Sequence, residues 1–203
     1  MKAEAYAYSM DKAQKPLRLP DFTANDVFDI DFALLAKLGV KHVIFDLDAT
    51  IRTAYSKSFD AEIVDYFKKL ESTHRFESVS LATNNIRNIS AFGAPFGARI
   101  FQPYFKKGRP VYKPHRDFFK RILVTLHAKP QEVVMIGDKI NTDVVGANRS
   151  GFFTVLVEPR GGDYWYETLM LTRYREKRAL HIARHKIENP KKRRFGGMFK
   201  HDD

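Results

Sequence analysis

Residues 43–50 read VIFDLDAT, an apolar run that leads directly into two aspartates. An apolar run without alternation predicts a strand that is buried on both faces, as in a parallel sheet. Asp46 and Asp48 follow two positions apart, and side chains at i and i+2 of an extended segment lie on the same face. The stretch therefore predicts a loop at a strand end in which two carboxylates face one centre.

Two carboxylates in this arrangement fit phosphoryl transfer. A carboxylate is a weak nucleophile, but beside a divalent cation Asp46 can attack phosphorus and form an aspartyl phosphate. Asp48, when protonated, can donate a proton to the leaving oxygen and then activate water for hydrolysis. The string D-x-D-x-T is a weak signal by itself, because paired aspartates also cap helices or bind calcium.

Strand and helix patterns alternate along the rest of the chain. Further strands are expected at residues 79–82, 99–101, 133–136 and 153–157. Helices are expected at residues 32–38, from Asp60 to 70, at 115–127 and 142–150, and over a long polar stretch from 164 towards 187. Glycines and prolines interrupt residues 91–114 and leave room only for the short strand at 99–101. This order predicts an α/β fold with an open, mainly parallel sheet and helices on both faces.

In such a sheet the ligand site lies beyond the carboxyl ends of the strands. Thr83 follows a predicted strand and offers a hydroxyl, although a threonine here is also an ordinary capping residue. Asp138 and Asp143 follow another strand in the loop GDKINTD and offer the hard oxygen ligands that Mg²⁺ prefers. Lys113 can balance phosphate charge, whereas a lone exposed lysine ordinarily has no function.

In their order along the chain, these groups together resemble the four motifs of the haloacid dehalogenase (HAD) superfamily. The matching residues are Asp46 with Asp48, Thr83, Lys113, and Asp138 with Asp143. The resemblance implies a Rossmann-like fold, a Mg²⁺ cofactor and a phosphatase that works through a phosphoaspartate.

The resemblance also implies a role for each acidic residue. Asp46 is expected to attack the phosphate and to bind Mg²⁺. Asp48 is expected to act as general acid and base and to bind the metal through its backbone carbonyl. Asp138 is expected to bind the metal directly, and Asp143 to support the site through water or by orienting the lysine.

The remaining motif residues are expected to bind the substrate phosphate. Thr83 and the neighbouring Asn84 amide would hold phosphate oxygens, and Lys113 would offset the charge of the phosphoaspartate. A receiver domain uses similar residue types around Mg²⁺. It has no acidic loop after the lysine and no second aspartate two residues beyond the nucleophile, so it fits poorly.

The gaps between the motifs are too short for a cap domain. Only a short loop fits between Asp48 and the helix at Asp60, and about thirty residues that include a strand separate Thr83 from Lys113. The resemblance is therefore to the capless members of the superfamily, class III. An open site suits a large substrate such as a protein, a nucleic acid end or a lipid head group.

A closer resemblance is to the YqeG-type branch, which includes phosphatidylglycerophosphate phosphatases. It spans residues 17–178 and is carried by the segments 19–30, 34–39, 83–85, 113–114 and 137–149. Two positions depart from the branch pattern. The branch usually has Asn where this chain has Ala49, and an apolar residue where this chain has Arg52. Arg52 either contacts a further anionic group or is a solvated surface charge, and both readings put the substrate in doubt rather than the chemistry.

The composition is that of a globular domain with a strong basic excess. The chain has 203 residues, 44% of them hydrophobic, a formal charge of +11 and no cysteine, which excludes disulfides and thiolate metal sites. We expect an N-terminal arm at 1–16, the phosphatase domain at 17–178 and a basic helix end and tail at 179–203. The tail either is a solvated extension or binds anionic lipid or nucleic acid phosphates.

Three functions remain open at this point. The first is a phosphatidylglycerophosphate phosphatase at a membrane surface, and the second is a phosphatase for a soluble nucleotide, a sugar phosphate or a phosphoprotein. The third is a basic nucleic-acid- or ribosome-associated protein, which the intact motifs disfavour. No apolar run approaches the roughly 20 residues of a membrane-spanning helix. We expect a cytoplasmic protein that associates peripherally with the inner face of the membrane.

Overall fold

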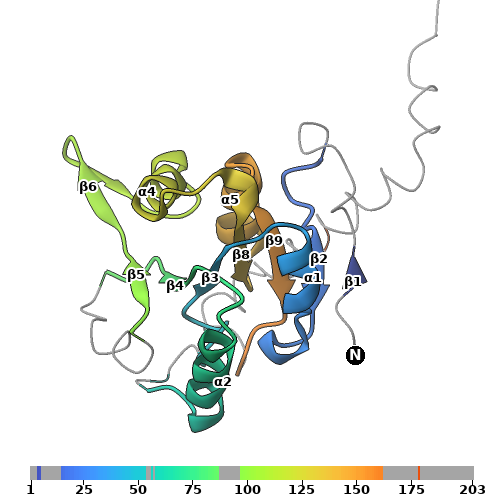
Figure 1. The fold of residues 1–203 in the computed structure, drawn as a ribbon. Coiled ribbons are helices and arrows are strands. Elements are labelled where there is room, and N and C mark those ends of the chain that lie inside the picture. Colours follow the sequence, from blue (N-terminus) through green and yellow to red (C-terminus); the bar gives the residue numbers. More distant parts are fainter. Residues whose placement is uncertain are drawn as a thin grey trace, which may run out of the picture.

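A seven-stranded sheet forms the centre of the computed structural model, which describes residues 4–5, 15–53, 56, 58–86, 97–161 and 178 (Figure 1). The strand order is β1-β2-β9-β8-β3-β4-β5. The strands are β1 (Glu4–Ala5), β2 (Phe22–Ala24), β3 (His42–Asp46), β4 (Ser78–Ala82), β5 (Arg99–Phe101), β8 (Val133–Gly137) and β9 (Phe153–Val157). β1 is antiparallel to β2, and every other neighbouring pair is parallel. The predicted mainly parallel sheet is confirmed.

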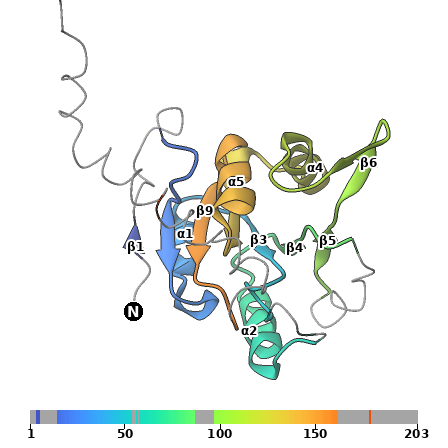
Figure 2. The same cartoon turned by 180° about the vertical axis from the view of Figure 1, so that it is seen from behind.

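Helices cover both faces of this sheet, as the sequence predicts (Figures 1 and 2). The α-helices are α1 (Phe32–Lys37), α2 (Ala61–Ser72), α4 (Arg116–Leu126) and α5 (Val145–Arg149), with 3₁₀ turns at Val27–Asp29 and Pro130–Glu132. Side chains of β3 alternate between the two layers: Val43 and Phe45 pack with α1 and α2, and Ile44 packs with α4. β3 is therefore buried on both faces, which agrees with the apolar run Val43-Ile44-Phe45 at its centre.

One pair of strands lies outside the main sheet and was not predicted. β6 (Tyr104–Lys106) and β7 (Arg109–Val111) form an antiparallel hairpin. Its two turn residues, Lys107 and Gly108, have φ values of 51° and 73°, as a type I′ hairpin turn requires. The interpretation of residues 91–114 as loop with only one strand is therefore wrong. Pro110 and Gly108 indicate interruptions in the sequence pattern, although both are compatible with a two-stranded edge hairpin.

The helix expected at residues 142–150 begins differently in the structure. A π-helical turn, Ile140–Val144, comes first, and α5 continues from it. Both Asp143 and Val144 donate their backbone N–H groups to the carbonyl of Lys139, at 3.0 and 3.3 Å. This wide turn places Asp143 beside the end of β8. The long helix expected from residue 164 and the basic tail lie outside the described residues, with the exception of residue 178.

The segment before β2 is held to the sheet by a buried polar cluster. Lys15 pairs with Asp21 at 2.6 Å, and Asp21 accepts hydrogen bonds from the backbone N–H and hydroxyl of Thr154 at 2.9 and 3.1 Å. Asn148 donates to the carbonyls of Leu17 and Leu19 at 2.9 and 2.8 Å. The branch-type segments around Asp21 and Asn148 therefore stabilise the fold and lie outside the carboxylate cluster. Within the described part of the chain, every helix falls short of the length and apolar character that a bilayer crossing requires.

Candidate active site

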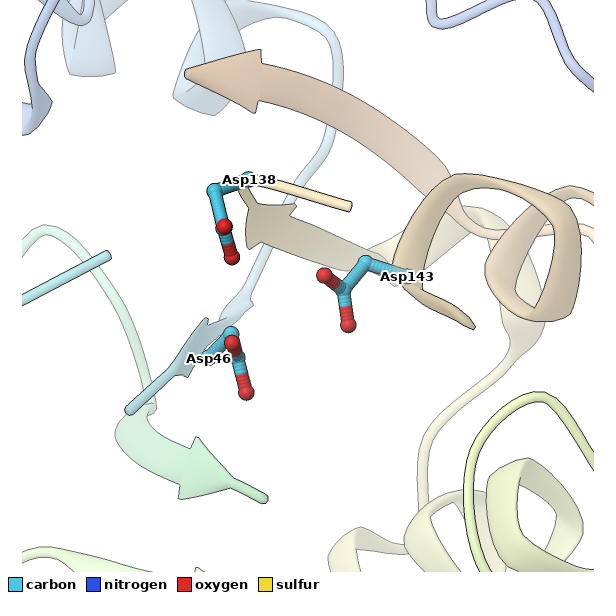
Figure 3. A group of neighbouring side chains, drawn as sticks. All are labelled: Asp46, Asp138 and Asp143. Carbon is cyan, nitrogen blue, oxygen red and sulfur yellow. The ribbon is translucent and has the colours of Figure 1, made fainter. Parts of the chain in front are cut away.

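The predicted site residues converge at the carboxyl ends of three central strands. Asp46 is the last residue of β3, Thr83 follows β4, and Asp138 follows β8. β4 and β8 both pair with β3 in parallel, so the carboxyl ends of these three strands are neighbours. Figure 3 shows Asp46, Asp138 and Asp143 pointing towards a common centre. These side chains therefore meet at the carboxyl edge of the sheet, where parallel sheets hold their ligand sites.

Three buried carboxylates form a compact cluster that can hold a cation. One oxygen from each of Asp46, Asp138 and Asp143 lies within 4.8 Å of the other two. Thr50 donates its hydroxyl to Asp138 at 3.2 Å. Asp143 accepts from the backbone N–H of Lys139 at 3.1 Å. These contacts orient the carboxylates before any ligand binds.

Lys113 lies in the middle of this cluster and is itself buried. Its Nζ donates to Asp46 at 2.5 Å, to Asp143 at 2.7 Å and to the carbonyl of Ala82 at 3.0 Å. Burial by itself would lower the pKa of Lys113, but the two carboxylates outweigh burial and hold this pKa above its usual value. The lysine therefore stays charged.

The charges of the cluster do not balance without a further cation. Burial raises the pKa of Asp46 well above its usual value; Lys113 opposes this increase, while Asp143 and Asp138 add to it. With all three carboxylates ionised, the single ammonium group of Lys113 would leave an excess of two negative charges in this buried site. A divalent cation with oxygen preference offsets that excess, so the donor set fits such an ion.

Asn84 positions the lysine through its backbone. Its Nδ2 donates to the carbonyl of Lys113 at 2.9 Å, and its Oδ1 accepts from the Lys113 N–H at 2.8 Å. Thr83, which is buried next to it, accepts from the N–H of Asn85 at 2.9 Å. Sequence reasoning expected an Asn84 amide at the substrate phosphate and missed this support of Lys113. The only available signal was the adjacency of the two asparagines to Thr83.

Asp48 lies apart from the carboxylate cluster and pairs with Arg52. The Arg52 Nε donates to Asp48 Oδ1 at 2.8 Å, and Nη2 makes a second, very short bond to the same oxygen. Nη1 donates to the carbonyl of Ser56 at 3.0 Å. Arg52 is 5% exposed, so its interpretation as a solvated surface charge is wrong. A tight turn also brings residues 48 and 52 together in an isolated parallel β-bridge. This contact was not expected from the sequence.

The two positions that depart from the branch pattern lie in this same loop. Ala49 has a φ of 61°, a left-handed conformation that Asn tolerates better than Ala. Its carbonyl accepts from the N–H of Arg160 at 2.7 Å. Neither the described part of this loop nor the described residues that follow β4 contain a cap domain, as the motif spacing predicts.

Comparison with known proteins shows the family to which this chain belongs. Residues 111–164 match the family model described as HAD-hydrolase-like. The probable phosphatase YqeG of Bacillus subtilis is 31% identical over 145 residues, which cover 71% of this chain and 80% of that protein. The chain therefore belongs to the haloacid dehalogenase-like hydrolases, and it is a phosphatase.

Two further proteins are more distantly similar to this chain. The chloroplastic/mitochondrial phosphatidylglycerophosphate phosphatase 1 of Arabidopsis thaliana is 26% identical over 150 residues, covering 70% of this chain and 41% of that protein. Among solved structures, the D,D-heptose 1,7-bisphosphate phosphatase of B. bronchiseptica is 20% identical with a TM-score of 0.48, covering 65% of this chain and 87% of that one.

Proposed function

We propose that this phosphatase hydrolyses the phosphomonoester of a lipid, phosphatidylglycerophosphate, at a membrane surface. The observation that carries the chemistry is the buried group formed by Asp46, Lys113, Asp138 and Asp143. A carboxylate nucleophile next to a fixed ammonium group suits attack on a phosphate dianion.

The first half of the reaction uses the two aspartates of the strand-end loop. Asp46 attacks phosphorus, and the bond between phosphorus and the lipid oxygen breaks as the new Asp46–phosphorus bond forms. Asp48, once protonated and released from its ion pair with Arg52, donates its proton to the departing lipid oxygen, which leaves as an alcohol. Thr83 and the backbone N–H of Asn84 hold phosphate oxygens, since the Asn84 side chain is bonded to the lysine backbone.

The second half regenerates the enzyme. Asp48, now a carboxylate, takes a proton from a water molecule that attacks the phosphoaspartate. The bond between Asp46 and phosphorus breaks, and inorganic phosphate leaves. Lys113 stays charged throughout and offsets the negative charge on the phosphoryl group. Arg52 holds the Asp48 side chain in one orientation between the two steps.

We propose Mg²⁺ as the cofactor, held by Asp46, Asp138, Asp143 and the backbone carbonyl of Asp48. The donor set consists of oxygens only, and the chain has no cysteine that would favour a softer metal. When bound, Mg²⁺ would neutralise charge on the transferring phosphoryl group.

The lipid substrate is supported by sequence similarity and by charge. The Arabidopsis relative carries phosphatidylglycerophosphate phosphatase in its name, and a capless site accepts a phosphate on a large molecule. A formal charge of +11 favours an anionic surface. We therefore place the protein at the cytoplasmic face of a membrane as a peripheral enzyme.

The test is phosphate release from phosphatidylglycerophosphate beside soluble sugar phosphates, nucleotides and a phosphopeptide. Asp46→Asn should lower turnover roughly a thousandfold or more, and a chelator should abolish it until Mg²⁺ is restored. Asp65→Asn, the same change at an exposed position of α2, is the matched control and should retain full activity. Hydrolysis of soluble esters alone would remove the lipid assignment, and activity in Asp46→Asn would remove the mechanism.

A further inference from the structure

The β6–β7 hairpin stands out from the body of the protein beside the active site. Figures 1 and 2 show it at the edge of the molecule, beyond α4. Phe105, the middle residue of β6, is 77% exposed, and Lys107 and Arg109 at the turn are exposed as well. Phe105 is one of five large hydrophobic side chains that are exposed in the described part of the chain, and Tyr112 and Ile86 are two of the others. A grouping of such side chains indicates a contact surface.

The composition of the hairpin is basic and apolar. Residues 104–113 read YFKKGRPVYK and contain no acidic side chain, and residues 104–112 also lack Asn, Gln, Ser and Thr. Lys106 is paired with Asp117 at 2.6 Å, which leaves Lys107 and Arg109 as the main source of positive charge. The hairpin thus offers cations and an aromatic ring to a partner.

Contacts at the base hold the hairpin against α4. The Arg121 guanidinium lies 4.3 Å from the ring centroid of Tyr104, and its Nη2 donates to the carbonyl of Gln102 at 2.6 Å. The Tyr104 hydroxyl donates to the carbonyl of Asp117 at 3.2 Å. The orientation of the hairpin relative to the sheet is therefore set by packing.

The hairpin is continuous with the active site. Its second strand ends one residue before Tyr112, which is 49% exposed and directly precedes the buried Lys113. At about 3.3 Å per extended residue, the turn lies within roughly 20 Å of Lys113. Asn84 is bonded to the same lysine backbone, and two residues further on Ile86 is 83% exposed.

We propose that this protein docks on an anionic lipid bilayer through the exposed apolar and basic side chains on and beside the hairpin. These are Phe105, Lys107, Arg109, Tyr112 and Ile86. The apolar side chains enter the interface between head groups and acyl chains, and the two cations bind lipid phosphates. Nucleic acid is the less favoured partner, because Ile86 offers it neither stacking nor charge. The inference deepens the proposed function, since docking here brings head groups to the edge of the sheet that carries Lys113.

The test measures binding of the full chain to vesicles by co-sedimentation. One set is a two-to-one mixture of phosphatidylcholine and phosphatidylglycerol, and the other is phosphatidylcholine alone. Lys107→Gln with Arg109→Gln should weaken binding to the anionic set roughly thirtyfold, since each cation near such a surface contributes about fivefold. Phe105→Ser should weaken it roughly tenfold. Lys68→Gln with Lys69→Gln removes the same charge from exposed positions of α2 and is the matched control.

Four results would overturn the proposal: no binding of the wild type to the anionic set, unchanged binding of both hairpin variants, an equal loss in the control, or loss of single-stranded RNA binding while vesicle binding persists. Turnover of para-nitrophenyl phosphate in solution, measured in parallel, should be the same in the wild type and the hairpin variants. A failure of docking with that turnover intact rejects the hairpin surface alone. A chain without any Mg²⁺-dependent turnover rejects the proposed function instead.

Discussion

Replacing Gly137 by Ala should weaken the proposed Mg²⁺ site without removing any of the residues proposed to hold the ion. Gly137 ends β8, and a Cβ at this position would lie 2.5 Å from Cγ and 2.7 Å from Cβ of Asp143. Ordinary contact begins near 3.4 Å, so Asp143 must move by about 0.9 Å. A shift of that size would stretch its 2.7 Å bond to Lys113 beyond hydrogen-bonding distance.

The expected loss follows from those contacts. A misplacement of about 1 Å in a reacting site lowers the rate by roughly a hundredfold. Disturbing a group that supports a metal lowers metal affinity by roughly 10- to 100-fold. Weakening two hydrogen bonds to a buried carboxylate should also lower the free energy of unfolding by about 1–3 kcal/mol. We therefore expect Gly137→Ala to need far more Mg²⁺ for half-maximal activity.

The assay is a Mg²⁺ titration of phosphate release, with urea unfolding of the same variants. Gly39→Ala is the control, because Gly39 has a φ of 88° and nothing within 4 Å of an added Cβ. Backbone strain there should cost about 1–2 kcal/mol of stability and leave the Mg²⁺ requirement unchanged. An unaltered Mg²⁺ requirement and turnover in Gly137→Ala would refute the assigned role of Asp143.

Two further predictions concern pairs within the fold. Arg52→Leu should lower the free energy of unfolding by about 1–3 kcal/mol, and the same change should cost less in an Asp48→Asn background. Additive effects in this double-mutant cycle would deny the pairing. Burial holds the pKa of His42 below its usual value, so the folded protein binds this proton more weakly than the unfolded chain does. The stability that neutral His42 contributes is therefore lost as the pH falls from about 6.5 through the lower pKa of the folded state. In urea unfolding, His42→Gln should lose less free energy of unfolding between pH 7 and pH 5 than the wild type does. An equal loss of free energy of unfolding in His42→Gln and in the wild type would contradict the lowered pKa of His42.

The sequence by itself predicted five of the seven strands of the sheet and the polar groups at its carboxyl edge. The apolar run before Asp46 and the strands before Thr83 and Asp138 are local patterns, and strand periodicity is set by neighbouring residues. A general rule for parallel sheets then brings their carboxyl ends together. For these residues no long-range information was needed.

Only the tertiary structure decided how these side chains are paired. Lys113 bonds to Asp46 across 67 residues and to Asp143 across 30, and Asn84 holds Lys113 across 29. Contacts of that sequence separation depend on strand register and loop path, which local patterns do not encode. The burial of Arg52 likewise follows from a loop closure that its charge did not suggest. The hairpin at residues 104–111 could also be recognised only in the structure. Its glycine and proline are equally compatible with an irregular loop and with a tight turn between edge strands.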